Sequence, residues 1–130
     1  MSKKVICMIP ARIGSQRFKK KNLALINNKP ILSWGIESAY NSKIFDEIII
    51  NGDNLIFEKI AKLYNLRYHN RQKLLSTSEA KSDDVIFDFL NIFKCDYIVW
   101  FNAIAPLQVT EDIRNFVDLL TSNKYTSLFA

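Results

Sequence analysis

Short apolar runs alternate along the chain with segments in which apolar residues recur at helical spacing. The apolar runs predict buried strands, at residues 4–9, 46–51, 66–68, 96–101 and 125–130. The helical spacing predicts four helices, at residues 30–42, 54–64, 82–93 and 110–120. Ser82 stands where an N-cap is expected, and Asp83 and Asp84 follow as first-turn acids rather than as a metal-binding pair, because adjacent helical residues point in different directions.

Strands that are apolar on both faces and separated by helices predict an α/β fold. We expect one domain over residues 1–130, built on an open, doubly wound, mostly parallel sheet with helices on both faces. The last strand only begins, so the sheet is expected to be incomplete at the C-terminus. In such folds ligands bind outside the carboxyl ends of the strands.

The net charge of +5 is concentrated in one segment. Residues 1–30 contain eight Lys and Arg side chains and no carboxylate, which leaves ten cations against 13 carboxylates in residues 31–130, a net charge of −3. Proteins that bind nucleic acid usually spread their cations over a face or groove, and no aromatic stacking pattern accompanies these. The distribution favours a compact anion over nucleic acid.

Membrane insertion and a disulfide framework are both disfavoured by the sequence. No run approaches the roughly 18 apolar residues of a spanning helix, and the run before Pro10 is too short for a signal peptide. We therefore expect a cytoplasmic protein with no membrane partner. Cys7 and Cys95 lie in apolar segments and are expected to be buried, reduced thiols.

The loop at residues 10–22 carries the candidate chemistry. It follows the first buried strand and contains five cations, Arg12, Arg17, Lys19, Lys20 and Lys21. Gly14 and Ser15 allow the backbone to turn its N–H groups toward an anion, so the loop predicts a nucleotide polyphosphate site. It matches neither the Walker nor the dinucleotide glycine pattern. The alternative is a solvated basic loop without a ligand.

The segment MIPARIGSQRFKKKNL, residues 8–23, closely resembles the N-terminal signature of acylneuraminate (sialic acid) cytidylyltransferases. The resemblance continues through residues 28–31, similar to the family's Gly-Lys-Pro turn, and through residues 45–53, similar to its second strand. Arg71, Leu75 and residues 82–85 fall at further family positions. The chain thus looks like the N-terminal portion of such an enzyme.

The resemblance implies an enzyme that joins a sugar hydroxyl to the α-phosphate of CTP and releases pyrophosphate, with Mg²⁺ whose ligands are expected to lie outside this chain. Its partners would be CTP and an acidic nine-carbon sugar. Arg12 and Lys21 would be the catalytic residues, holding the triphosphate and stabilising the leaving pyrophosphate. The implied nucleotide-binding residues are Ala11, Gly14, Ser15, Gln16, Asn22, Asp53, Arg71 and Ser82. Asn102 would contact the acceptor sugar.

Other interpretations remain open beside this one. Taken without the resemblance, Arg71 is a surface loop cation and Ser82 only a helix cap, while His69 is a surface residue at a strand end. Gln16 replaces a family Lys, and residues 101–108 depart from the family's acceptor segment. The alternatives are therefore a related keto-deoxy-octulosonate cytidylyltransferase and a non-catalytic nucleotide-binding or interaction domain. An incomplete sheet also predicts a homodimer or self-association.

Overall fold

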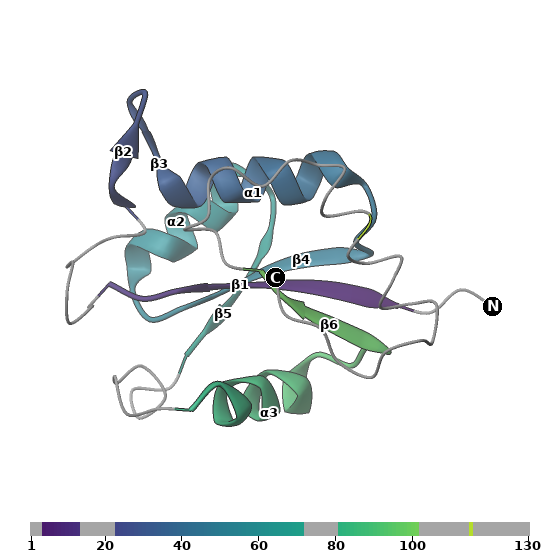
Figure 1. The fold of residues 1–130 in the computed structure, drawn as a ribbon. Helices are drawn as coiled ribbons and strands as arrows, with labels where there is room; N and C mark the ends of the chain where they lie inside the picture. Colours follow the sequence, from purple (N-terminus) through teal and green to yellow (C-terminus); the bar gives the residue numbers. More distant parts are fainter. Residues whose placement is uncertain (1–3, 14–22, 72–80, 102–114, 116–130) are drawn as a thin grey trace.

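Four parallel strands form the centre of the molecule in the spatial order β5-β4-β1-β6. The computed structural model describes residues 4–13, 23–71, 81–101 and 115. The strands are β1 (Val5–Ala11), β4 (Glu47–Gly52), β5 (Arg67–Asn70) and β6 (Tyr97–Trp100). The sheet grows from β1 through β4 to β5, and the chain then crosses back to place β6 on the other side of β1 (Figure 1). The order reverses beside β1, which makes this the topological switch point.

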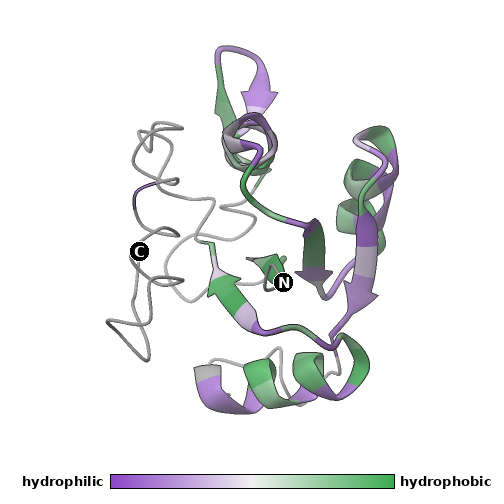
Figure 2. Ribbon diagram, turned by 90° about the vertical axis from the view of Figure 1, so that its right-hand side faces the viewer, coloured by the Kyte–Doolittle hydropathy of each residue, from purple (hydrophilic) through white to green (hydrophobic). Residues whose placement is uncertain are grey.

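Helices cover both faces of the sheet, as the sequence predicts. α1 (Ile31–Ser42) and α2 (Leu55–Leu63) lie on one face and α3 (Ser82–Ile92) on the other (Figure 1). Alternate residues of β1 serve the two layers: Cys7 and Ile9 are buried with α1 and α2, whereas Met8 is buried with α3. In Figure 2 α3 lies alone below the sheet, with apolar and polar segments alternating along it.

α1, α2 and α3 begin within one residue of the starts that the sequence predicts. The Asn54 side chain caps α2 by accepting a hydrogen bond from the Ile56 N–H at 3.0 Å. Asp83 and Asp84 lie in the first turn of α3, as expected. The expectation that Ser82 is the N-cap was wrong, because its backbone is already helical and Lys81, in an extended conformation, occupies the cap position.

A two-stranded hairpin precedes α1 and was missed by the sequence analysis. β2 (Leu25–Ile26) pairs antiparallel with β3 (Lys29–Pro30), and the hairpin stands away from the sheet in Figure 1. Asn27 and Asn28 both have positive φ, 51° and 64°, as a two-residue primed turn requires. The Asn-Asn pair was the available signal, because Asn adopts positive φ more readily than most residues.

The structure also bears on the expectations for the cysteines, for membrane-spanning helices and for the last helix and strand. Both cysteines are free thiols and Cys7 is buried as expected, but the expectation was wrong for Cys95, which is half-buried in the segment before β6. In the part of the chain that the structure describes, no helix is long and apolar enough to cross a membrane. Of the helix expected at residues 110–120 only Asn115 is described, and its backbone is helical. The strand expected at residues 125–130 lies outside the described residues.

Candidate functional site at the carboxyl edge of the sheet

Three of the residues that the sequence analysis singled out follow three adjacent strands at one edge of the sheet. Arg12 follows β1, Asp53 follows β4 and Arg71 follows β5. We call this edge, where these strands end, the carboxyl edge. The register aligns Ala11 with Gly52 and Gly52 with Asn70, so the strands end side by side. The fold therefore brings together side chains that lie up to 59 positions apart in the sequence.

Hydrogen bonds donated by two backbone N–H groups hold this edge together. The Ile13 N–H donates to Asp53 Oδ1 at 2.9 Å, which ties the start of the cationic loop to the end of β4. The Arg71 N–H donates to the Gly52 carbonyl at 2.6 Å, which ties β4 to the residue after β5. The Asp53 side chain thus helps to hold the end of β4 against the start of the loop, while its expected role in nucleotide binding stays a prediction.

Arg71 is buried, with 5% of its surface exposed, so it is not a surface loop cation. Its Nε–H donates to Asn51 Oδ1 at 2.7 Å. Burial lowers the pKa of Arg71 from its ordinary value, and the charge of Arg12 lowers it further, whereas Asp53 opposes the shift. A buried guanidinium needs hydrogen-bond acceptors to offset its desolvation. The Asn51 oxygen is one such acceptor, so the Arg71 side chain is held in place at the carboxyl edge.

His69 is also buried, with 8% of its surface exposed, and the expectation of a surface residue at a strand end was wrong. Its Nδ1 lies 2.6 Å from Asn51 Nδ2, and its Nε2 lies 3.7 Å from Asp88 Oδ2 on α3. The ring makes T-shaped contacts with Phe89 and Phe93, with centroids 5.7 and 5.5 Å away. Burial lowers the His69 pKa, Asp88 raises it and Arg71 lowers it. The physical reason for the error is that α3 packs over this strand end.

Asn51 joins these two residues and was not singled out as a site residue. It is fully buried in β4, directly after three isoleucines, and bonds to both His69 and Arg71. A polar amide at the carboxyl end of an apolar strand was the available signal, because a buried amide requires hydrogen-bond partners.

Gly52 lets a tyrosine pack closely against the end of β4. A Cβ atom at this position would lie 2.9 Å from Tyr68 Cε1 and 3.1 Å from Phe57 Cβ. The Tyr68 hydroxyl donates to the Asn54 carbonyl at 3.1 Å, and burial raises the Tyr68 pKa. The glycine thus leaves room for an aromatic ring between the end of β4 and the start of α2.

The other site residues fall into two groups. Ala11 is buried in the core beneath α1 and α2, so it offers a ligand only its backbone, and Ser82 begins α3. The remaining expected site residues lie outside the described part of the chain: Gly14, Ser15, Gln16, Lys21, Asn22 and Asn102. Among the described residues, no group of three or more His, Cys, Asp or Glu side chains could hold a metal ion.

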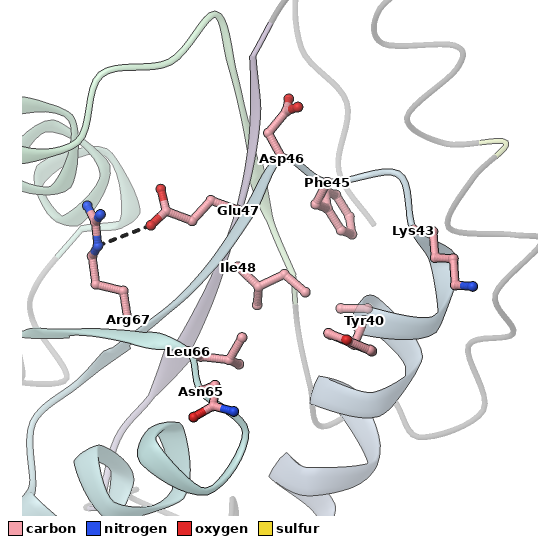
Figure 3. A pocket seen from close by; sticks show the side chains of 10 residues that line it. Tyr40, Lys43, Phe45, Asp46, Glu47, Ile48, Asn65, Leu66 and Arg67 are labelled. Carbon is pink, nitrogen blue, oxygen red and sulfur yellow. Dashed lines mark ion pairs between the residues drawn. The ribbon is translucent and has the colours of Figure 1, made fainter.

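A separate pocket of about 490 Å³ lies at the opposite edge, where the strands begin, which we call the amino edge. Figure 3 shows Tyr40 and Lys43 from the end of α1 on one side of it and Arg67 on the other. Arg67 Nε forms an ion pair with Glu47 Oε1 at 3.1 Å. The pocket therefore does not include Arg12, Asp53 or Arg71, and the candidate site is the carboxyl edge.

Comparison with known proteins gives a family and two named relatives. The family model described as cytidylyltransferase matches residues 6–129. The chain is 32% identical to a pseudaminic acid cytidylyltransferase of Campylobacter jejuni, over 98% of this chain and 57% of the relative. It is also 32% identical to an N-acylneuraminate cytidylyltransferase of Escherichia coli, over 95% of this chain and 28% of the relative. The chain thus spans about half or less of these relatives.

Solved structures share the fold at lower identity. A CMP:2-keto-3-deoxy-manno-octonic acid synthetase complexed with CTP superposes with a TM-score of 0.80 at 18% identity, covering 92% of this chain and 48% of that one. Rv0371C of Mycobacterium tuberculosis, complexed with manganese, superposes with a TM-score of 0.61 at 16% identity, covering 90% and 60%. The doubly wound architecture expected from the sequence is confirmed.

Proposed function

The chain belongs to the cytidylyltransferase family, and from this premise we propose that it binds CTP as the nucleotide-binding part of an enzyme that transfers CMP to an acidic nine-carbon sugar. The observation that carries the proposal is the convergence of Arg12, Asp53 and Arg71 at the carboxyl edge, beside the switch point of the sheet. The sugars named for the two relatives, a neuraminate and a pseudaminate, support this acceptor class.

The reaction needs charge neutralisation and placement more than it needs a covalent protein group. A sugar hydroxyl oxygen attacks the α-phosphorus of CTP, the bond from that phosphorus to the bridging oxygen breaks, and pyrophosphate leaves while the hydroxyl proton is lost. In our proposal Arg12 and Lys21 neutralise the triphosphate and the leaving pyrophosphate. Gly14, Ser15, Gln16 and Asn22 supply loop contacts to the nucleotide, as the resemblance implies.

Arg71 is proposed to contact the cytosine base together with Ser82. A guanidinium only donates hydrogen bonds, and the O2 and N3 atoms of cytosine only accept them. Its Nε–H is already committed to Asn51, so the orientation of the guanidinium is fixed before a ligand arrives. Preorganisation of this kind lowers the entropic cost of binding.

A divalent ion, Mg²⁺ in our proposal, would accompany the triphosphate, and the manganese complex of one structural neighbour is consistent with a divalent ion. The described residues do not form a site for it. Asp53 is the carboxylate that the structure places with Arg12 and Arg71, and its Oδ1 already accepts the Ile13 N–H. We therefore assign no step to the ion. A cytoplasmic location belongs to the same proposal.

Calorimetric titration tests the nucleotide half of the proposal. CTP should bind at least about tenfold more tightly than ATP, GTP or inorganic triphosphate, because a site that hydrogen-bonds the cytosine edge leaves polar groups unpaired with other bases. Equal affinity for the four ligands would refute the proposal, since a basic loop alone gives that result.

Pyrophosphate release tests the transfer. Incubation with Mg²⁺, CTP and an acidic sugar should release pyrophosphate only when the sugar is present. A panel of a neuraminate, a pseudaminate and a keto-deoxy-octulosonate identifies the acceptor, the last being the alternative left open by the altered segment at residues 101–108. CTP binding without release from any sugar would instead identify a non-catalytic nucleotide-binding domain.

A further inference from the structure

We propose that Asn51 is a positioning residue that holds the Arg71 guanidinium in one orientation, and that neutral His69 fixes the amide of Asn51 so that it can do this. The inference rests on the proposed function only in making Arg71 part of the nucleotide site. The three side chains form a continuous path from β4 to β5, with His69 to Asn51 at 2.6 Å and Asn51 to Arg71 at 2.7 Å.

The donor and acceptor properties of the three groups allow one arrangement. The Nε of Arg71 carries a hydrogen and can only donate, so the Asn51 atom that faces it must be the oxygen. The Asn51 nitrogen then faces His69 Nδ1 and donates to it, which makes Nδ1 the acceptor. His69 is therefore neutral, with its hydrogen on Nε2, which faces Asp88.

Protonation of His69 conflicts with this arrangement. It would place an N–H on Nδ1 against the N–H groups of Asn51, and turning the amide over would set its nitrogen against the donor of Arg71. Among the described residues, the charged groups that face His69 are Asp88 from α3 and Arg71 at the end of its own strand, while Phe89 and Phe93 supply apolar contact. Acidification is therefore expected to loosen Arg71 through Asn51.

The arrangement can be tested without any ligand. In the full chain labelled with ¹⁵N, the ring nitrogen shifts of His69 should show a bare Nδ1 and a protonated Nε2 near neutral pH, and a sharp Arg71 Nε–H signal should be present. In Asn51→Asp the new carboxylate still accepts from Arg71 but cannot donate to His69. The His69 tautomer should then reverse, its pKa should rise, and the Arg71 signal should persist.

Asn70→Asp is the matched control, because it adds the same charge on the neighbouring residue of β5, whose side chain is exposed. It should leave the His69 tautomer unchanged. The same tautomer in wild type and Asn51→Asp, or a wild-type ring with its hydrogen on Nδ1, would overturn the proposal. A residue that merely filled space would not move this spectroscopic pattern.

The functional consequence is read from CTP binding in wild type and His69→Gln. The Gln side-chain oxygen can accept from Asn51 but does not titrate. The ratio of the two dissociation constants cancels the titration of CTP itself. Between about pH 7.5 and about pH 5.5, wild type should weaken about threefold more than His69→Gln. A ratio of dissociation constants that stays the same at both pH values would overturn the coupling between His69 and Arg71. If neither protein prefers CTP, the proposed function is overturned instead, and the role of Asn51 is then decided by the spectra recorded without ligand.

Discussion

The two edges of the sheet use the same kinds of charged residue in opposite ways. At the amino edge, Glu47 faces both Arg67 at 3.1 Å and Lys4 at 4.0 Å, and the two cations are exposed while the Glu47 side chain is partly buried. At the carboxyl edge, Arg71 is buried and lies near the second cation Arg12 as well as Asp53. At the amino edge one carboxylate pairs with two cations, whereas at the carboxyl edge we propose that two cations also bind the negative charge of a nucleotide.

Arg67 and Arg71 stand at the two ends of a five-residue stretch and show the same contrast between the edges. The Arg67 side chain is 59% exposed and pairs with a carboxylate, which is a structural arrangement of little energetic weight. Arg71 is buried, and its Nε is held by a neutral amide. An amide orients a guanidinium without cancelling its charge, which is why we propose that Arg71 contacts the nucleotide.

The largest expected effect comes from replacing Arg71 with glutamine, and the same replacement at Arg67 is its control. Arg71→Gln should weaken CTP binding by about 10- to 100-fold, because hydrogen bonds from a charged donor are worth about 1.5–3 kcal/mol. Arg67→Gln, the matched control at the other end of β5, should change it by less than about twofold. Calorimetric titration of both variants, with circular dichroism to verify folding, measures this. Similar losses in the two would show that general positive charge is responsible.

The sequence predicted the scaffold well because the scaffold depends on local patterns. Apolar runs located β1, β4 and β6, and helical spacing located α1, α2 and α3, since strand and helix periods are properties of the chain itself. The hairpin of β2 and β3 was missed because its strands are two residues long and lack a periodic pattern. Its turn depends on the backbone conformation of Asn27 and Asn28.

The site was predicted only in part, because burial is a property of the whole fold. Position after a buried strand and the family resemblance identified Arg12, Asp53 and Arg71. Neither could show that α3 covers His69, or that a buried amide would join it to Arg71. The error at His69 came from treating a strand end as exposed, when the carboxyl end of β5 is closed by a helix packed across it.

A methyl group at Gly52 should destabilise the carboxyl edge. Gly52→Ala is expected to lower the free energy of unfolding by about 1–3 kcal/mol, because the new Cβ would overlap Tyr68 and approach Phe57 Cβ. Denaturant unfolding measures the change. If the clash is with the ring, the loss in Gly52→Ala combined with Tyr68→Ala should be smaller than the sum of the two single losses. Additive losses would place the strain elsewhere.

Two aspartates at the amino edge should contribute less, and unequally. Asp46 Oδ2 accepts the Val5 N–H at 2.7 Å in a half-buried position, and Asp96 Oδ2 accepts the Lys4 N–H at 2.7 Å in an exposed one. Asp46→Ala should cost about 1 kcal/mol of unfolding free energy and Asp96→Ala less, because water replaces the lost acceptor at the exposed bond. Chemical denaturation of the pair measures the difference. Equal costs would contradict this explanation.

The smallest effect is expected at the ion pair that faces the amino-edge pocket. Glu47→Gln keeps the shape of the side chain and removes its charge from Arg67 and Lys4. The unfolding free energy should fall by about 0.5 kcal/mol or less, and the difference should disappear at about 1 M salt, where exposed charges are screened. CTP binding should be unchanged, because the two edges lie at opposite ends of the strands. A change in CTP affinity would show that the edges are coupled through β4, and the division of the molecule into a self-balanced edge and a ligand-binding edge would then fail.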